Sequence, residues 1–117
     1  MFDFIWTTWS PTNEKFEPAK KDQQMYAMIT NWEFSAITEE MINAVETVFF
    51  PRMKSAGALD VYNIQTSENS ATVVSIWPDQ AAADRAMEAV SSIRSEATSS
   101  FASTIVSAQS GPVVVKA

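Results

Sequence analysis

Residues 71–90 constrain the fold more than any other segment of this chain. An apolar run, Ala-Thr-Val-Val-Ser-Ile-Trp, ends at Trp77, and an alanine-rich amphipathic segment begins directly after Pro78 and Asp79. The run is typical of a buried strand, and Asp79 is a favourable N-cap for a helix over the segment that follows. We expect this helix to bury a stripe made of Ala83, Ala86, Met87, Val90, Ile93 and Ala97.

A strand and a helix are predicted before this junction. Residues 25–34 are rich in β-prone side chains, contain no Gly or Pro, and are largely apolar on both faces. Thr38 is a favourable N-cap for a first helix, which Pro51 should kink or end and which Gly57 should stop. Its apolar residues recur at helical spacing: Met41, Val45, Val48 and Phe49.

The remaining elements complete a β-α-β-β-α-β order. Residues 58–66 form a second strand, and a polar turn at 67–70 joins it to the strand 71–77 as a hairpin. The serine-rich segment 98–103 is expected to be a fraying helix end, before a last strand over 104–115 that breaks at its Gly-Pro pair. The predicted fold is α+β, a ferredoxin-like four-stranded antiparallel sheet with two helices on one face.

The length of 117 residues predicts one domain. We expect it to span residues 24–117, preceded by an aromatic-rich segment, 1–23, that is either an extra edge strand or an arm on the body or on a partner. The opening residues lack the basic region of a signal peptide. No apolar run approaches the roughly 20 residues of a membrane span.

The predicted sheet is apolar on two faces, while the chain supplies helices for one face only. A second copy packed sheet against sheet with two-fold symmetry is the simplest cover for the other face. We therefore predict a homodimer, with residues 1–23 and the late apolar run 112–115 as candidate cross-subunit elements.

Composition excludes several classes of site. The chain has no Cys and no His, which removes disulfides, thiolate chemistry, Ser-His-Asp triads and His-ligated zinc. A net charge of −6 without a basic stripe argues against nucleic acid and anionic membranes as partners. With two Gly there is no phosphate-binding loop. We predict no metal and no cofactor, and the lack of Cys is compatible with a cytoplasmic location.

Two segments resemble a known superfamily: the first strand with Thr-Asn-Trp-Glu-Phe, and the junction Val-Val-Ser-Ile-Trp-Pro-Asp-Gln-Ala-Ala. Over roughly residues 24–117 the chain resembles the dimeric ferredoxin-like α+β barrels, in particular the antibiotic-biosynthesis-monooxygenase-like group. The resemblance implies a small apolar ligand between sheet and helices, and an activity that ranges among members from cofactor-free oxidation to lactone isomerisation. Haem degraders carry a further Trp near the position of Ala86 and a His on the second helix, which this sequence lacks.

Asn31 and Glu33 are the candidate catalytic residues, because they are polar and share one face of the first strand. The resemblance implies that Asn31 polarises a substrate, since several members place an Asn there. Asn31 would donate a hydrogen bond to a ligand carbonyl or enolate, and Glu33 would act as a base if burial raised its pKa. The alternative is that this end of the strand leaves the sheet and that water surrounds both side chains.

Three aromatic residues and one cation are the candidate ligand-binding residues. Trp32, Tyr62 and Trp77 would line a pocket for a flat apolar molecule, or else belong to the core or to a dimer interface. Arg85 would anchor an anionic ligand at the mouth of the pocket, or else belong to a solvated helix face.

The leading functional hypothesis is a homodimer that binds a small apolar or aromatic molecule in each subunit. Its enzymatic form is a cofactor-independent monooxygenase or isomerase acting on an enolisable, polycyclic or acyl substrate. The alternatives are a ligand-binding protein without catalysis and an assembly protein whose pocket is filled by its own side chains.

Overall fold

The computed structural model describes residues 24–117, so the predicted N-terminal segment 1–23 lies outside the described residues. The elements follow the predicted order, and one long helix is divided into three consecutive segments. They are β1 (Tyr26–Phe34), α2 (Glu39–Ala44), η2 (Val45–Phe49), α3 (Phe50–Ser55), β2 (Asp60–Ser67), β3 (Ser70–Trp77), α4 (Gln80–Phe101) and β4 (Ser103–Pro112).

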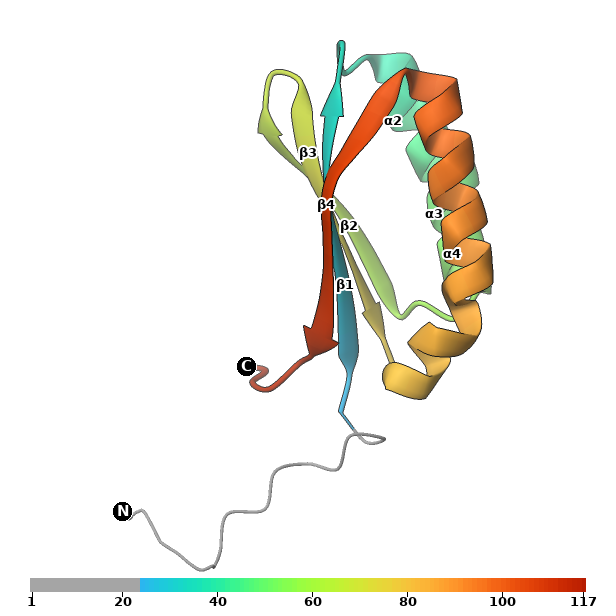
Figure 1. Cartoon of the computed structure of the whole chain (residues 1–117), viewed down its shortest axis with the longest axis vertical. Helices are drawn as coiled ribbons and strands as arrows, with labels where there is room; N and C mark the ends of the chain where they lie inside the picture. The colour runs from blue at the N-terminus through green and yellow to red at the C-terminus, as the bar shows by residue number, and fades with distance from the viewer. Residues whose placement is uncertain (1–23) are drawn as a thin grey trace, which may run out of the picture.

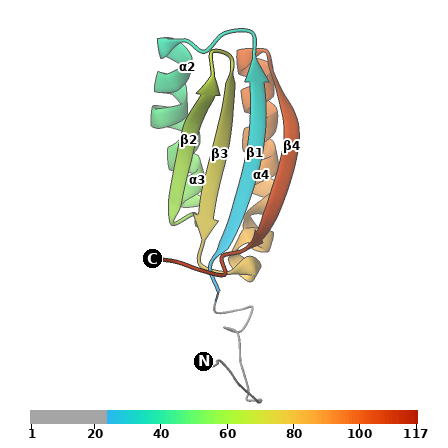
Figure 2. The same cartoon turned by 90° about the vertical axis from the view of Figure 1, so that its left-hand side faces the viewer.

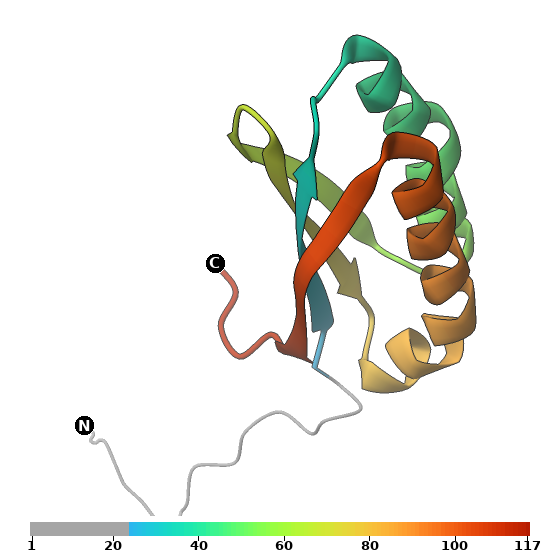
Figure 3. The ribbon, with the colours of Figure 1, turned by 45° about the horizontal axis from the view of Figure 1, so that its top comes forward.

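The four strands form one antiparallel sheet in the order β2-β3-β1-β4. Within residues 24–117, the divided first helix and α4 pack on one face of this sheet, here called the inner face (Figure 1). Figure 3 shows the same two-layer arrangement from above, with the C-terminal tail leaving the sheet on the side away from the helices. The predicted α+β fold with two helices on one face is confirmed.

Both helices begin where the sequence predicts. The Thr38 hydroxyl accepts a hydrogen bond of 3.1 Å from the Met41 N–H, and the Asp79 carboxylate accepts one of 2.7 Å from the Ala82 N–H. Each cap pairs one of the N–H groups that the first helical turn leaves without a partner. Gly57 ends the first helix with φ +121°, a conformation that side chains other than hydrogen disfavour.

Pro51 widens the first helix instead of ending it. Proline has no N–H, and its ring crowds the carbonyl four residues earlier, so a regular α turn cannot continue through it. The turn Val45–Phe49 is therefore a π-helix, in which the Phe50 N–H donates to the Val45 carbonyl five residues back. This wide turn places Val45, Phe49 and Phe50 together on the side that faces the sheet.

Four details differ from the sequence expectation. Val48 and Met87, expected in the apolar stripes of the two helices, are exposed rather than buried. The serine-rich end of α4 stays helical to Phe101 and stops at Ala102, which has a left-handed φ of 49°.

The last strand also differs. Gly111 and its proline neighbour pair with β1 rather than break β4, which ends at residue 112. The irregularity lies instead opposite Asn31 and Trp32, where Val106 is the extra residue of a β-bulge. Within residues 24–117, no helix combines the length and apolar character that a bilayer crossing requires.

The core lies between the inner face and the helices. Trp77 is 0% exposed, and its indole N–H donates to the Ser75 hydroxyl at 2.9 Å. A side chain at Gly57 would meet the Trp77 ring at 3.7 Å, so the end of the first helix packs closely over this tryptophan. Other core residues come from α4, where alanines allow close approach to the sheet: Ala83, Ala86, Val90 and Ile93.

No described element covers the other face of the sheet, here called the outer face. Figure 2 views this face directly, with all four strands in front of the helices. Because side chains alternate along strands, β1 sends its odd-numbered residues here, and Ile29 lies opposite Val74 of β3. Further apolar side chains follow on β3 and β2: Ile76, Tyr62 and Ile64.

Candidate functional site: the inner cavity

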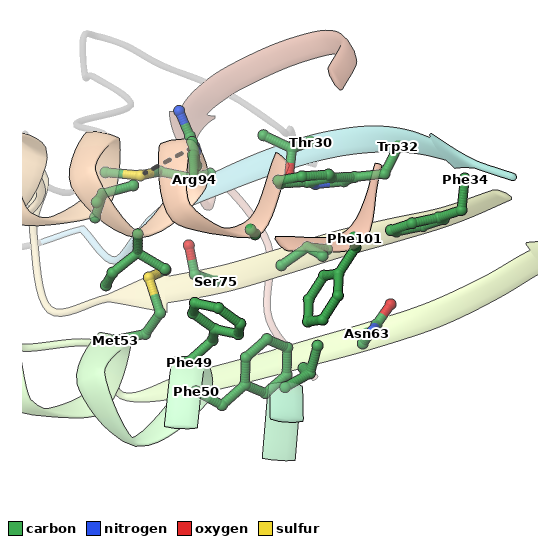
Figure 4. A pocket seen from close by; sticks show the side chains of 16 residues that line it. Thr30, Trp32, Phe34, Phe49, Phe50, Met53, Asn63, Ser75, Arg94 and Phe101 are labelled. Carbon is green, nitrogen blue, oxygen red and sulfur yellow. Dashed lines mark hydrogen bonds between the residues drawn. The ribbon is translucent and has the colours of Figure 1, made fainter. Parts of the chain in front are cut away.

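A cavity of about 70 Å³ lies between the inner face and the helices. Most of its lining is apolar, and α4, the π-helical turn and three strands all contribute to it (Figure 4). We call this space the inner cavity. Its lining residues are Met28, Thr30, Trp32, Phe34, Val45, Phe49, Phe50, Met53, Asn63, Val73, Ser75, Val90, Ile93, Arg94, Ala97 and Phe101.

Aromatic rings form two opposing pairs in this lining. Trp32 and Phe34, two residues apart on β1, stack with centroids 6.1 Å apart and planes 8° from parallel. Phe49 and Phe101 meet edge to face, with centroids 5.6 Å apart and planes at 81°. Both arrangements are favourable for aromatic quadrupoles, so the rings hold one another in defined orientations. The wall of the cavity therefore consists of ring faces and ring edges in defined orientations.

Two of the polar groups in the lining are already paired. The Thr30 hydroxyl accepts the indole N–H of Trp32 at 2.7 Å, and the Ser75 hydroxyl accepts that of Trp77. These bonds satisfy the buried indole donors, which would otherwise be costly to bury. Asn63 and Arg94 are the other polar side chains of the lining.

Arg94 is the one ionisable residue in the lining of the inner cavity. It is half-buried on α4, and its Nη2 lies 3.9 Å from the sulfur of Met28, to which it donates. Burial in this apolar setting lowers the pKa of Arg94 from its ordinary value. A thioether is a weak acceptor, so most of the hydrogen-bonding capacity of the guanidinium is not used by this contact.

A second space, the outer cavity, adjoins the first and has a volume of about 370 Å³. Phe34, Val45, Phe50 and Asn63 line both cavities, so the two spaces are neighbours. The outer cavity lies on the same side of the sheet as the helices, not on the outer face. It is lined by residues of α2 and β2, and it includes the carboxylate of Glu46 and the amide of Gln65. The exposed Asn63 stands where the two cavities meet.

The two candidate catalytic residues do not line either cavity. Asn31 lies on the outer face, where its Nδ2 donates to the Ser107 hydroxyl at 2.8 Å and its Oδ1 accepts from the Thr72 hydroxyl at 2.6 Å. Glu33 is exposed on the same face, near the end of β1. The expectation that both point into a pocket under the helices is corrected, because β1 sends its even-numbered residues there.

The four candidate ligand-binding residues are separated. Trp32 lines the inner cavity. Trp77 is packed in the core beside it, Tyr62 is 54% exposed on the outer face, and Arg85 is exposed on α4. The structure therefore does not gather them into one pocket.

Sequence reasoning missed the cation and two rings that make the cavity. Arg94 stands at the helical spacing of the buried stripe, one residue after Ile93 and four after Val90, a position that signals an inward-facing side chain. Phe101 extends the same stripe. Phe50 carries no such signal, because two consecutive helical residues reach the same cavity here only through the π-helical turn.

No protein-family model matches the chain, and no curated protein matches it significantly. Solved structures share its architecture. A dimeric ferredoxin-like protein from an uncultured marine organism aligns with TM-score 0.52 and 11% identity, over 84% of this chain and 93% of that chain.

SnoaB, a cofactor-independent oxygenase from Streptomyces nogalater, aligns with TM-score 0.52 and 14% identity, over 80% of this chain and 95% of that one. A variant of SnoaB aligns with TM-score 0.57 and 10% identity, over the same shares. The chain therefore has the ferredoxin-like fold of these proteins.

Proposed function

We propose that this protein is a homodimer in which each subunit binds one flat, apolar or aromatic molecule in the inner cavity. The observation that carries the proposal is the lining itself: ordered aromatic rings, aliphatic side chains and few polar groups around a space that adjoins a larger one. Small-molecule sites are commonly concave and mostly apolar, with a few placed polar groups.

Ring geometry favours a planar ligand. Trp32 and Phe34 present parallel faces, while Phe49 and Phe101 present an edge and a face, and a planar guest can stack or meet edges with each pair. The outer cavity supplies the additional room that a two- or three-ring molecule needs.

The homodimer is supported by the outer face and by the tail. Ile29, Val74 and Ile76 form the middle of an apolar surface that no described element covers. Val114 and Val115 are 76% and 84% exposed in the tail that leaves on the same side (Figure 3). A structure with this fold is itself described as dimeric. A second subunit packed on the outer face would cover both this apolar surface and the tail.

The binding proposal is tested with 2-naphthamide, a neutral planar probe, by calorimetric titration of the full chain. We expect binding with one probe per subunit. Ala97→Phe places a ring in the inner cavity and should weaken binding at least tenfold, while Ala89→Phe on the exposed side of α4 should not. If the wild type binds neither 2-naphthamide nor the carboxylate of the same shape, 2-naphthoate, or if both variants bind equally, the proposal is contradicted.

The enzymatic alternative is a cofactor-independent monooxygenase or isomerase, which the shared fold with an oxygenase favours. In that alternative Asn31 and Glu33 act from the outer face, at a surface that the partner subunit completes, because neither lines the inner cavity. Oxygen uptake with an enolisable polycyclic substrate measures this activity. Asn31→Ala should abolish uptake and leave the dimer intact, and unchanged uptake would remove Asn31 from the reaction.

The cytoplasmic location stays a prediction, as does a role for Arg85 as a ligand anchor. Arg85 is exposed and lies outside the lining of both cavities, so it would have to act at the surface of α4.

A further inference from the structure

We infer that the inner cavity selects ligands carrying a group that is anionic in water at neutral pH, such as a carboxylate, and that Arg94 binds this group. The inference rests on the proposed function and adds the chemical class of the ligand. Three observations carry it: the place of Arg94, its partners, and the lack of any other ionisable residue in the described lining of the inner cavity.

Arg94 occupies a position that α4 otherwise gives to apolar residues. Val90, Ile93 and Ala97 share its side of the helix and line the same cavity. Holding a guanidinium among such neighbours costs free energy, and an exposed position elsewhere on the helix would avoid that cost. Burial accordingly lowers the pKa of this arginine. An anion in the cavity would recover the lost hydration energy.

The partners of Arg94 leave room for such an anion. Within residues 24–117 its side chain donates a hydrogen bond of 3.9 Å to the sulfur of Met28, and no carboxylate in that range forms an ion pair with it. Glu96 is only two residues away, but both of its oxygens accept from Arg52, at 2.9 and 3.0 Å. The planar fork of a guanidinium suits a carboxylate or a similar pair of oxygens.

The lining also limits how the anion forms. Apart from Arg94, the side chains around the inner cavity are apolar, hydroxyl or amide, so none of them can take a proton from a ligand at neutral pH. The ligand must therefore ionise in water before it enters, which selects groups with a pKa below about 7. A weakly acidic alcohol or amide would arrive neutral and gain little from Arg94.

The two ends of the cavity are chemically different. Arg94 lies at the Met28 end of β1, while Phe34 and Asn63 lie at the other end, next to the outer cavity (Figure 4). The anionic group of the ligand should therefore bind at the inner end, with its rings along Trp32 and Phe34. An uncharged extension would pass Asn63 toward the outer cavity.

The test compares two probes of nearly equal shape, 2-naphthoate and 2-naphthamide, at pH 7.5 on the full chain. Wild type should bind the carboxylate more tightly than the amide. Arg94→Gln should raise the Kd of 2-naphthoate by about tenfold or more and that of 2-naphthamide by less than twofold, as expected for the loss of a charged hydrogen bond. Glu88→Gln, which removes a charge from the exposed side of the same helix, is the control and should change neither value.

The other possible outcomes contradict the inference alone or the inference together with the binding proposal. Equal affinities of the wild type for both probes, or an unchanged 2-naphthoate Kd in Arg94→Gln, overturn the inference and leave the binding proposal standing. No binding of either probe overturns both. If Arg94→Gln fails to fold, Arg94→Met keeps a long apolar stem and replaces it, with the same expected loss for 2-naphthoate.

Discussion

The two faces of the sheet carry similar residue types but differ in how far their side chains are exposed. Both faces carry Ile, Val, Tyr or Trp side chains from the same strands. On the inner face Trp77 is completely buried, whereas on the outer face Tyr62 is 54% exposed. The difference arises because the helices of residues 24–117 cover one face only (Figures 1 and 2). The inner face therefore contains the core, and the outer face is the surface to which we assign the proposed dimer contact.

Trp77→Ala should have the largest effect on this comparison. Removing a fully buried indole leaves a large void and an unpaired Ser75 hydroxyl, so the free energy of unfolding should fall by about 3–5 kcal/mol. Tyr62→Ala removes a ring of similar size from the outer face and should cost about 1 kcal/mol or less in the monomer. Urea unfolding measures both values, and equal losses would show that the two faces contribute alike.

Much of the inner face was predictable from local patterns. The caps Thr38 and Asp79 and the stop at Gly57 follow from short-range chemistry, and the structure confirms all three. The alternation along residues 25–34 predicts two faces but not which one receives the helices, because both are apolar. For that reason the placement of Asn31 in a pocket failed.

The cavity itself depends on features that are not local. Pro51 is visible in the sequence as a disruption, but whether it ends or widens a helix depends on packing against the sheet. Arg94 could have been found, since it occupies the helical spacing of the buried stripe. A charge there contradicts the pattern, and such contradictions concentrate at functional sites.

Val74→Lys should sharpen the role proposed for the outer face. Val74 lies opposite Ile29 near the middle of that face, so a lysine there would be buried against a partner subunit. We expect the dimer Kd to rise at least about 100-fold while the monomer stays folded, because an unpaired charge is costly to bury. Sedimentation velocity measures the change, with Ala89→Lys on exposed α4 as the control. Wild-type affinity in Val74→Lys would place the interface elsewhere.

Two asparagines offer a smaller, matched comparison. Asn31 bridges Thr72 and Ser107 across three strands of the outer face, whereas Asn63 is exposed on β2 at the junction of the cavities. Asn31→Ala should lower the free energy of unfolding by about 1–2 kcal/mol, since two hydroxyl partners lose their bonds. Asn63→Ala should change it by less than about 0.5 kcal/mol. Thermal and urea unfolding of both variants distinguish a structural role of Asn31 from a purely catalytic one.

The smallest expected effect concerns the ion pair of Arg52 and Glu96, here called the clamp, which joins α3 to α4. Arg52 donates to both oxygens of Glu96, and this bonding lowers the pKa of Glu96 from its ordinary value of 4.5. A lowered folded-state pKa means that the pair stabilises the protein above the unfolded-state pKa and that this contribution is lost as the pH falls through the folded-state value.

Glu96→Gln should therefore be slightly less stable than the wild type at pH 7, and the difference should vanish at a pH below both pKa values. Urea unfolding at the two pH values measures it, with Glu88→Gln, exposed on the same helix, as the control. Because both partners are exposed, solvent screens their attraction and the effect must be small. A large or pH-independent difference would mean that the clamp also holds the helices in the positions that shape the inner cavity, and that the surface of the helical layer contributes to the stability assigned above to its buried side.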